Sequence, residues 1–154
     1  MGELKDTFIC HASKDKQSVV KPLLDALDKE NISYWYDEAE IKWGDSIPDK
    51  INEGLRMSRY VIVVLSDAFL SKNWPQRELN SSLNIESSTG KVRVLPLIIG
   101  SKEVMEKILQ NYPILNDKRH LVWENDLKKI IEELKRCLGR LDKKVESKNL
   151  DDEE

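Results

Sequence analysis

Cysteine and histidine are both scarce in this chain of 154 residues, which contains two of each. Cys10 and Cys137 lie far apart in a sequence long enough to form its own core, so we expect reduced, structural thiols and no disulfide framework. His11 and His120 make a poor metal set, and neither a CxxC nor an HExxH motif is present. We therefore expect no metal ion and no resident cofactor.

Long hydrophobic runs and an excess of positive charge are also missing. The longest apolar run, residues 60–65, is far shorter than the roughly 18 residues of a membrane helix, and the N-terminal residues contain no signal-peptide core. We therefore expect a cytoplasmic protein without membrane contact. The formal net charge of -3 argues against direct nucleic-acid binding, because phosphate contacts require clustered Lys and Arg.

Several motifs of nucleotide-binding and catalytic proteins are absent as well. The sequence has no GxxxxGK[ST] loop and no GxGxxG loop. A phospho-receiver needs clustered acids after its first strand, but Cys10 and His11 stand there. Since these two neighbours lie on an extended segment, their side chains point to opposite faces and do not form a nucleophile-base pair.

The composition is that of one folded domain. Hydrophobic residues make up 40% of the chain and charged residues 34%, and the length suits a single core. We place the domain at residues 4–141. Residues 142–154 are acidic, contain almost nothing apolar and end in DDEE, so we expect a disordered tail.

Strand and helix patterns alternate along this domain. The uninterrupted β-branched run YVIVVL is typical of a central strand that is covered on both faces. Helices are indicated by apolar residues at helical spacing. The predicted strands are 6–10, 33–36, 60–65, 92–98 and 120–123, and the predicted helices are 19–27, 46–55, 73–86, 102–109 and 127–141. The order predicts an α/β flavodoxin-like doubly wound sandwich, a five-stranded parallel sheet in the order 2-1-3-4-5 with helices on both faces.

Two prolines bear on where helices begin. Pro22 has no N–H to donate, so the first regular helix either starts late or is kinked there. Pro48 falls in the first turn of the second helix, where the missing N–H costs nothing, and either Asp45 or Ser46 is its N-cap.

In a sheet of this kind, ligands bind beyond the carboxyl ends of the strands where the strand order reverses, here between the first and third strands. The loops at this edge are residues 11–16, 37–45 and 66–74, and all are polar. Trp74 and Glu78 lie four residues apart at the start of a predicted helix, so they share one face beside the same edge. Taken alone this pair is weak evidence, because such a Glu is usually solvated and a Trp is usually core.

Five ordered segments resemble the TIR (Toll/interleukin-1 receptor-like) domains. Residues 8–15 (FICHASKD) are similar to the first family motif, with Cys10 where Ser is commoner. Residues 34–37 (YWYD) and 42–47 (KWGDSI) resemble the second strand and the BB loop. Residues 58–66 (SRYVIVVLS) and 74–79 (WPQREL) resemble the third strand and the WxxxE helix. The resemblance covers most of the chain.

The family contains NAD hydrolases and signalling scaffolds, and the resemblance to the enzymatic branch implies a set of site residues. The Glu of WxxxE, which cleaves the nicotinamide-ribose bond in that branch, falls on Glu78. The NAD-contacting positions fall on His11, Ala12, Ser13, Lys42, Trp43 and Trp74. Lys42 and His11 would meet the diphosphate, and Trp43 or Trp74 would stack on a ring. The sequence lacks the Pro-Gly pair common in the BB loop of animal receptors, which favours the bacterial type.

The resemblance therefore implies an NAD glycohydrolase that yields nicotinamide and ADP-ribose or a cyclic ADP-ribose isomer. It also implies activation by TIR-TIR self-association through the BB loop, with a separate sensor or effector protein as a further partner and bacterial defence or signalling as the role. The domain fills the sequence, so we expect no built-in clustering element. The alternative is a non-catalytic TIR-TIR interaction module, for which Glu78 is dispensable.

Overall fold

The computed structural model describes residues 4–42, 44–70, 93–111, 121–123 and 127–139. The predicted helix at 73–86, the domain boundary at 141 and the acidic tail at 142–154 lie outside the described residues.

The strands form one parallel sheet. Its members are β1 (Lys5–Ala12), β2 (Tyr34–Trp35), β3 (Glu40–Ile41), β4 (Ser58–Leu65), β5 (Val94–Ile98) and β6 (Leu121–Val122). The order is β2-β1-β4-β5-β6, with β3 paired to the end of β1, and every pairing is parallel. Leaving β3 aside, this is the predicted order 2-1-3-4-5, and the β-branched run of β4 is its centre.

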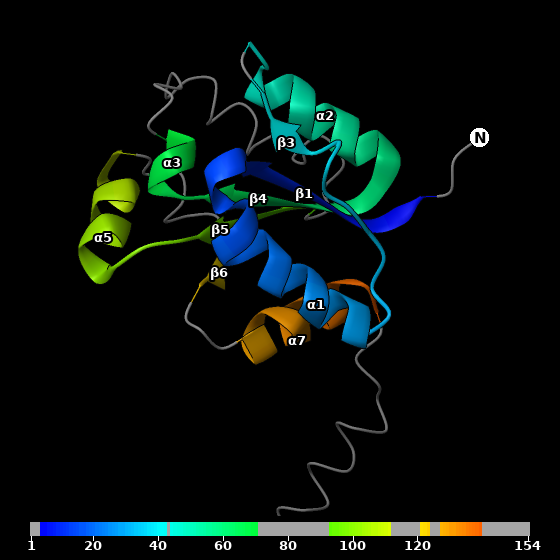
Figure 1. Ribbon diagram of the computed structural model, residues 1–154. Coiled ribbons are helices and arrows are strands. Elements are labelled where there is room, and N and C mark those ends of the chain that lie inside the picture. Colours follow the sequence, from blue (N-terminus) through cyan, green and yellow to red (C-terminus); the bar gives the residue numbers. More distant parts are fainter. Residues whose placement is uncertain (1–3, 43, 71–92, 112–120, 124–126, 140–154) are drawn as a thin grey trace, which may run out of the picture.

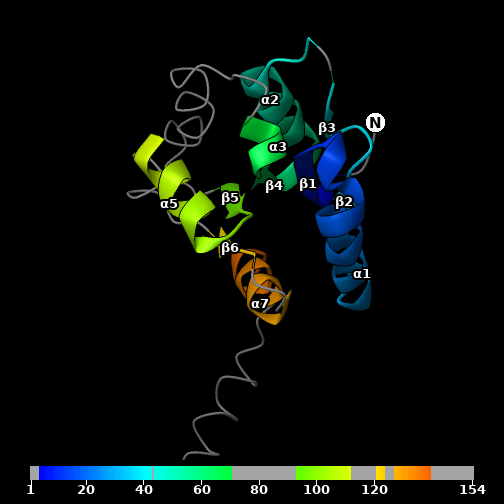
Figure 2. The same ribbon diagram turned by 60° about the vertical axis from the view of Figure 1, so that its left-hand side comes forward.

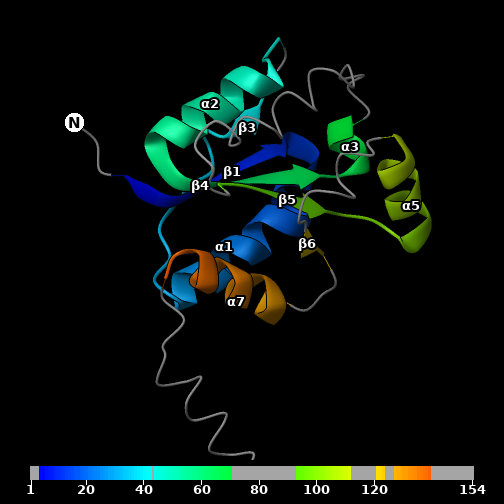
Figure 3. The ribbon, with the colours of Figure 1, turned by 180° about the vertical axis from the view of Figure 1, so that it is seen from behind.

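Helices cover both faces of the sheet, which confirms the predicted sandwich. Figures 1 and 2 show α2 (Ile47–Met57) on one face, and α1 (Lys21–Lys29) and α7 (Leu127–Cys137) on the other. The shorter α3 (Asp67–Leu70) follows β4, and α5 (Lys102–Asn111) lies beyond the end of β5, as seen from behind in Figure 3.

The side chains of β1 alternate between the two resulting cores, as the period of a strand requires. Phe8 and Cys10 pack in the core beneath α2, whereas Ile9 packs in the core beneath α1 and α7. Because both faces are covered, Asp6 to Ala12 are all buried, and this accounts for the uninterrupted apolar run from Phe8 to Cys10.

The helix starts follow local sequence signals. Regular α-helix begins at Lys21, immediately before Pro22, after a 3-10 turn at Ser13–Asp15 and a π-helical turn at Lys16–Val20. The late start is therefore the correct alternative for Pro22. At α2 the N-cap is Ser46, whose Oγ accepts a hydrogen bond from the Asp49 N–H at 3.5 Å, and Pro48 lies in the first turn as predicted.

Two short elements correct the sequence-based assignment. The sequence predicts loops at residues 37–45 and 66–74, yet β3 lies in the first and α3 in the second. Each is too short for periodicity to reveal it. In the part of the chain that the structure describes, no helix has the length and apolar character needed to cross a membrane.

Candidate functional site

The loops after β1, β2 and β4 converge at one edge of the sheet. Parallel strands end on the same side, and the strand order reverses between β1 and β4, which pair directly along residues from Lys5 to Cys10. Figure 1 shows the turn after β1 and helix α3 together at this edge. The structure thus brings together the described parts of the three loops that the sequence pointed to.

His11 is the first of the predicted contact residues, and its side chain is fully buried. Its Nδ1 lies 2.7 Å from the carbonyl oxygen of Ile9, and its Nε2 lies 3.9 Å from Oε1 of Glu40. Among the described residues, nothing hydrogen-bonds to Nε2. Burial lowers the pKa of His11 below its usual value. In this conformation the ring lies inside the protein, so its nitrogens do not face solution. The contact of His11 with a diphosphate stays a prediction.

Ala12 and Ser13 complete the predicted segment after β1. Ala12 is buried in the core and pairs with Ile41 of β3. Ser13 begins the 3-10 turn and is exposed at the edge of the sheet. Of residues 11–13, only Ser13 presents its side chain to a ligand in solution.

A buried contact between Asp15 and Ser66 joins the loop after β1 to the loop after β4. The Ser66 hydroxyl donates to Oδ2 of Asp15 and accepts from the N–H of Phe69 at 3.0 Å. Burial raises the pKa of Asp15, although the hydrogen bond from Ser66 opposes this. Sequence reasoning placed Asp15 in the loop but missed the pair. A serine directly after a strand and three residues before Phe69 was the available signal, since it caps α3.

Lys42 lies at the tip of the loop between β2 and α2, which we call the 37–45 loop. Its side chain is exposed, and its N–H donates to Oδ2 of Asp45 at 2.7 Å. The Asp45 N–H donates back to the Lys42 carbonyl at 2.9 Å, which closes a tight turn. Gly44 has a φ of +89° in this turn, a conformation that side chains with a Cβ rarely adopt.

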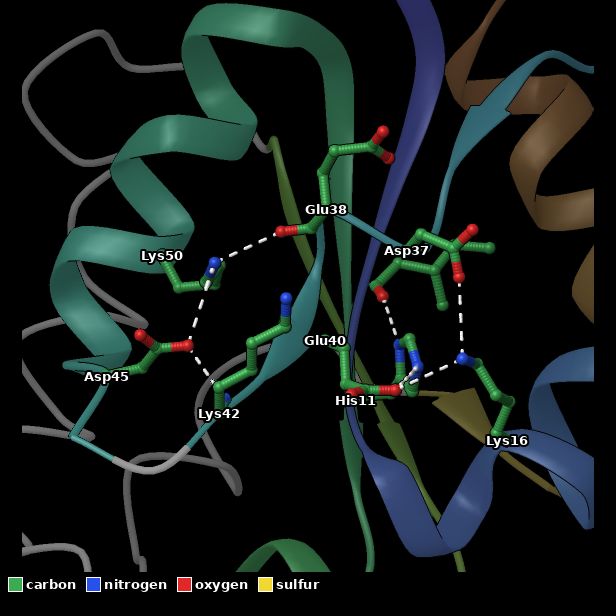
Figure 4. A network of polar contacts seen from close by, with 9 residues as sticks. His11, Lys16, Asp37, Glu38, Glu40, Lys42, Asp45 and Lys50 are labelled. Atoms are coloured by element: carbon green, nitrogen blue, oxygen red, sulfur yellow. Dashed lines mark hydrogen bonds and ion pairs between the residues drawn. The ribbon is translucent and has the colours of Figure 1, made fainter.

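Two lysines approach the 37–45 loop from neighbouring elements (Figure 4). Lys16, in the turn after β1, lies 3.4 Å from Oδ1 of Asp37 and 3.3 Å from Oε1 of Glu40. The hydrogen bond to Glu40 is the main reason that the pKa of Lys16 is raised. Lys50 of α2 donates to the Glu38 carbonyl at 3.1 Å.

Cys10 does not serve this edge as a nucleophile. It is buried in the core beneath α2, and burial raises the pKa of its thiol to about 12, so the reactive thiolate is scarce at neutral pH. Its neighbour His11 hydrogen-bonds toward Ile9, which lines the opposite core. Cys10 and Cys137 form no disulfide bond with each other.

The remaining predicted site residues, Glu78, Trp43 and Trp74, lie outside the described residues. Within the ranges that the structure describes, no group of three His, Cys, Asp or Glu side chains could hold a metal ion.

The fold and the position of these loops define a doubly wound α/β domain whose candidate binding edge is the switch point between β1 and β4. Comparison with family models gives the particular family. The TIR domain model matches residues 7–136, so the chain belongs to the TIR domain family.

Curated relatives share 36–42% sequence identity with this chain. The chain is 42% identical over 113 residues to the 2′ cyclic ADP-D-ribose synthase BtTIR of Bacteroides thetaiotaomicron, covering 73% of this chain and 38% of that protein. It is 36% identical over 135 residues to the NAD(+) hydrolase TcpA of a Theionarchaea archaeon, covering 88% of this chain and 40% of that protein. The chain thus spans about two-fifths of the length of these relatives.

Solved structures show the same fold. The TIR domain of the Toll-related receptor TRR-2 from Hydra magnipapillata matches with a TM-score of 0.56 at 21% identity, over 85% of this chain and 98% of that one. A TIR-STING receptor from C. gigas matches with a TM-score of 0.60 at 18% identity, over 88% of this chain and 39% of that one. At these identities the likeness concerns the fold alone.

Proposed function

We propose that this chain is an NAD glycohydrolase that cleaves the nicotinamide-ribose bond and releases nicotinamide with ADP-ribose or a cyclic ADP-ribose isomer. The observation that carries the proposal is the 36–42% identity to relatives named NAD(+) hydrolase or 2′ cyclic ADP-D-ribose synthase. The polar loops at the switch point of the sheet support it, because that edge is where doubly wound domains bind nucleotides.

Glu78 is the proposed catalytic residue. Nicotinamide is already a cationic leaving group, so the reaction needs little acid catalysis and mainly needs stabilisation of a positively charged ribose. One carboxylate is sufficient for this, whereas ordinary glycosidases use a pair because their leaving oxygen must be protonated. Glu78 would hydrogen-bond the ribose hydroxyls and either stabilise the charge or bond the anomeric carbon briefly. Capture of the sugar by water gives ADP-ribose, and capture by another part of the substrate gives a cyclic isomer.

The other proposed contact residues differ in whether their side chains are exposed or buried. Ser13 and Lys42 have exposed side chains at the edge of the sheet, suited to hydroxyl and diphosphate groups. The burial of His11 and Ala12 leads us to assign them backbone contacts only. We retain Trp43 and Trp74 as stacking partners of the substrate rings, on the family resemblance.

We further propose that copies of the chain self-associate through TIR-TIR contacts that include the 37–45 loop, and that this assembly activates cleavage. A separate sensor or effector protein is the candidate for bringing copies together, in bacterial defence or signalling. We place this activity in the cytoplasm, since cysteines without a disulfide bond are typical of a reducing compartment.

Nicotinamide release from NAD tests the proposal. The wild type, at high concentration or clustered on a resin, is expected to release nicotinamide, and chromatography then distinguishes ADP-ribose from a cyclic isomer. Glu78→Gln is expected to lower the rate by at least about 100-fold, because it removes the stabilising charge but keeps the side-chain shape. Circular dichroism and thermal unfolding of both proteins control for folding.

Two other outcomes would contradict the role of Glu78 or the proposed activity. Equal release by the wild type and a folded Glu78→Gln would remove Glu78 from the mechanism. No release from either protein under clustering would favour the non-catalytic interaction module.

A further inference from the structure

The 37–45 loop is held from two sides by lysine ammonium groups. Among the described residues of this loop, Ala39 and Ile41 are the ones buried in the core, where they anchor its middle by apolar packing. Polar contacts hold the rest, and Figure 4 shows Lys50 and Lys16 reaching the loop from α2 and from the turn after β1.

Lys50 makes contacts at both ends of the loop. Its side chain is only 14% exposed, and its Nζ lies 3.1 Å from the Glu38 carbonyl oxygen and 3.7 Å from Oδ2 of Asp45. A third partner, Oε2 of Glu53 at 3.6 Å, belongs to the same helix and not to the loop. A single ammonium therefore ties the start and the end of the loop to α2.

The Asp45 oxygen that faces Lys50 also sets the tip of the loop. That Oδ2 accepts the Lys42 N–H at 2.7 Å. Lys50 therefore orients the carboxylate that orients the backbone of Lys42. An ammonium held by several oxygens and largely shielded from water restricts them more than an exposed surface pair does.

Lys16 acts on the opposite side of the loop. It bridges Asp37, before β3, and Glu40, within β3, and it comes from the turn that follows β1. The same turn carries Ser13. The two lysines together fix the 37–45 loop relative to α2 and relative to the first of the substrate-facing loops.

We propose that Lys50 and Lys16 are positioning residues that hold the 37–45 loop so that its tip, at Lys42, faces the substrate. The effect on NAD cleavage rests on the proposed function, whereas the effect on the order of the loop does not. Neither lysine is assigned a contact with the substrate. Loss of positioning should therefore raise the KM for NAD more than it lowers kcat.

The chain offers a matched set of variants to test Lys50. Lys50→Met removes the ammonium and keeps the length of the side chain, and Lys50→Arg restores the charge. Asp45→Asn keeps an oxygen to accept the Lys42 N–H but removes the charge that faces Lys50. Glu53→Gln removes the carboxylate that contacts the same ammonium without touching the loop.

Two readouts separate positioning from catalysis. Amide-water exchange of Lys42 and Asp45 by NMR reports the order of the loop without any substrate, and steady-state kinetics under clustering report KM and kcat. Lys50→Met and Asp45→Asn are expected to raise the amide exchange rates and to increase KM by about three- to tenfold, with kcat within about twofold. Lys50→Arg and Glu53→Gln are expected to match the wild type. Lys16→Met is expected to give the same pattern, rescued by Lys16→Arg.

The outcomes that overturn the inference differ from those that overturn the function. The positioning role would be contradicted by unchanged amide exchange in Lys50→Met and Lys16→Met. It would also be contradicted if Glu53→Gln raised the amide exchange rates as much as Lys50→Met does. Increased exchange in a protein whose wild type cleaves no NAD would support the loop contacts and refute the proposed activity. A loss of kcat at unchanged KM in the lysine variants would mean that they act in the chemical step.

Discussion

The buried imidazole of His11 is the least expected single feature of this domain. A ring that is completely shielded from water at the end of β1 is more stable when neutral, and its Nδ1 meets the Ile9 carbonyl oxygen. Burial lowers its pKa, the positive charge of Lys16 acts in the same direction, and the Ile9 carbonyl, Glu40 and Asp15 oppose the shift. A side chain in this environment contributes to the stability of the fold and makes that stability depend on pH.

Acidification is therefore expected to destabilise the protein through His11. The unfolded chain has the ordinary His pKa of about 6.5 and the folded chain a lower one, so the unfolded state binds the proton first as the pH falls. The contribution of His11 is complete above about pH 6.5 and is lost between that pH and the lower folded pKa, at no more than about 1.4 kcal/mol per pH unit. Urea unfolding at a series of pH values from 8 to 5 measures this, with His11→Gln as the comparison. Parallel pH profiles for the two proteins would contradict the prediction.

Helix α2 depends on a close approach to the sheet. A Cβ at Gly54 would lie 2.6 Å from Cδ1 of Phe8 and 2.8 Å from Cγ2 of Val61, so the absence of a side chain lets the helix pack against β1 and β4. This contact also sets the height of Lys50, one turn earlier on the same helix, above the 37–45 loop.

Gly54→Ala is therefore expected to destabilise the protein by about 1–3 kcal/mol through overpacking. The same change in an exposed helix would instead stabilise it by up to about 1 kcal/mol, because Ala is the better helix former. Urea unfolding gives the free energy difference, and Arg56→Ala on the exposed side of α2 is the control. A stabilised Gly54→Ala would show that α2 can move away from the sheet at no cost.

The described parts of the loops after β1, β2 and β4 lie at one edge of the sheet, and the proposed self-association includes the 37–45 loop at this edge. If activity requires TIR-TIR contacts, each chain should be a poor enzyme at high dilution. Nicotinamide release per chain is then expected to rise by about tenfold or more on a clustering resin, because tethering raises the effective concentration of neighbours. Light scattering at the same concentrations reports assembly directly. Activity per chain that stays constant from dilute solution to resin would show that a single copy is sufficient.

Local patterns in the sequence were sufficient to predict the strand order of the sheet. The uninterrupted apolar run of β4 marked a strand buried on both faces. Asp45 or Ser46, with Pro48, marked the start of α2, and the structure selects Ser46. Strand burial and helix capping act over a few neighbouring residues. The alternating order of elements and the pairing rules for parallel sheets then led to the strand order and to the edge where the loops meet.

The roles of individual side chains at that edge depended on contacts between distant parts of the chain. His11 is buried because both faces of β1 are covered, and β3, a pairing too short to leave a pattern in the sequence, brings Glu40 to 3.9 Å from its Nε2. Asp15 and Ser66 are 51 residues apart, and Lys50 meets Glu38 across 12 residues. Such pairs form only when the fold brings distant segments together. Residue type and spacing therefore located the edge, and tertiary packing decided which side chains are exposed there and which are buried or paired.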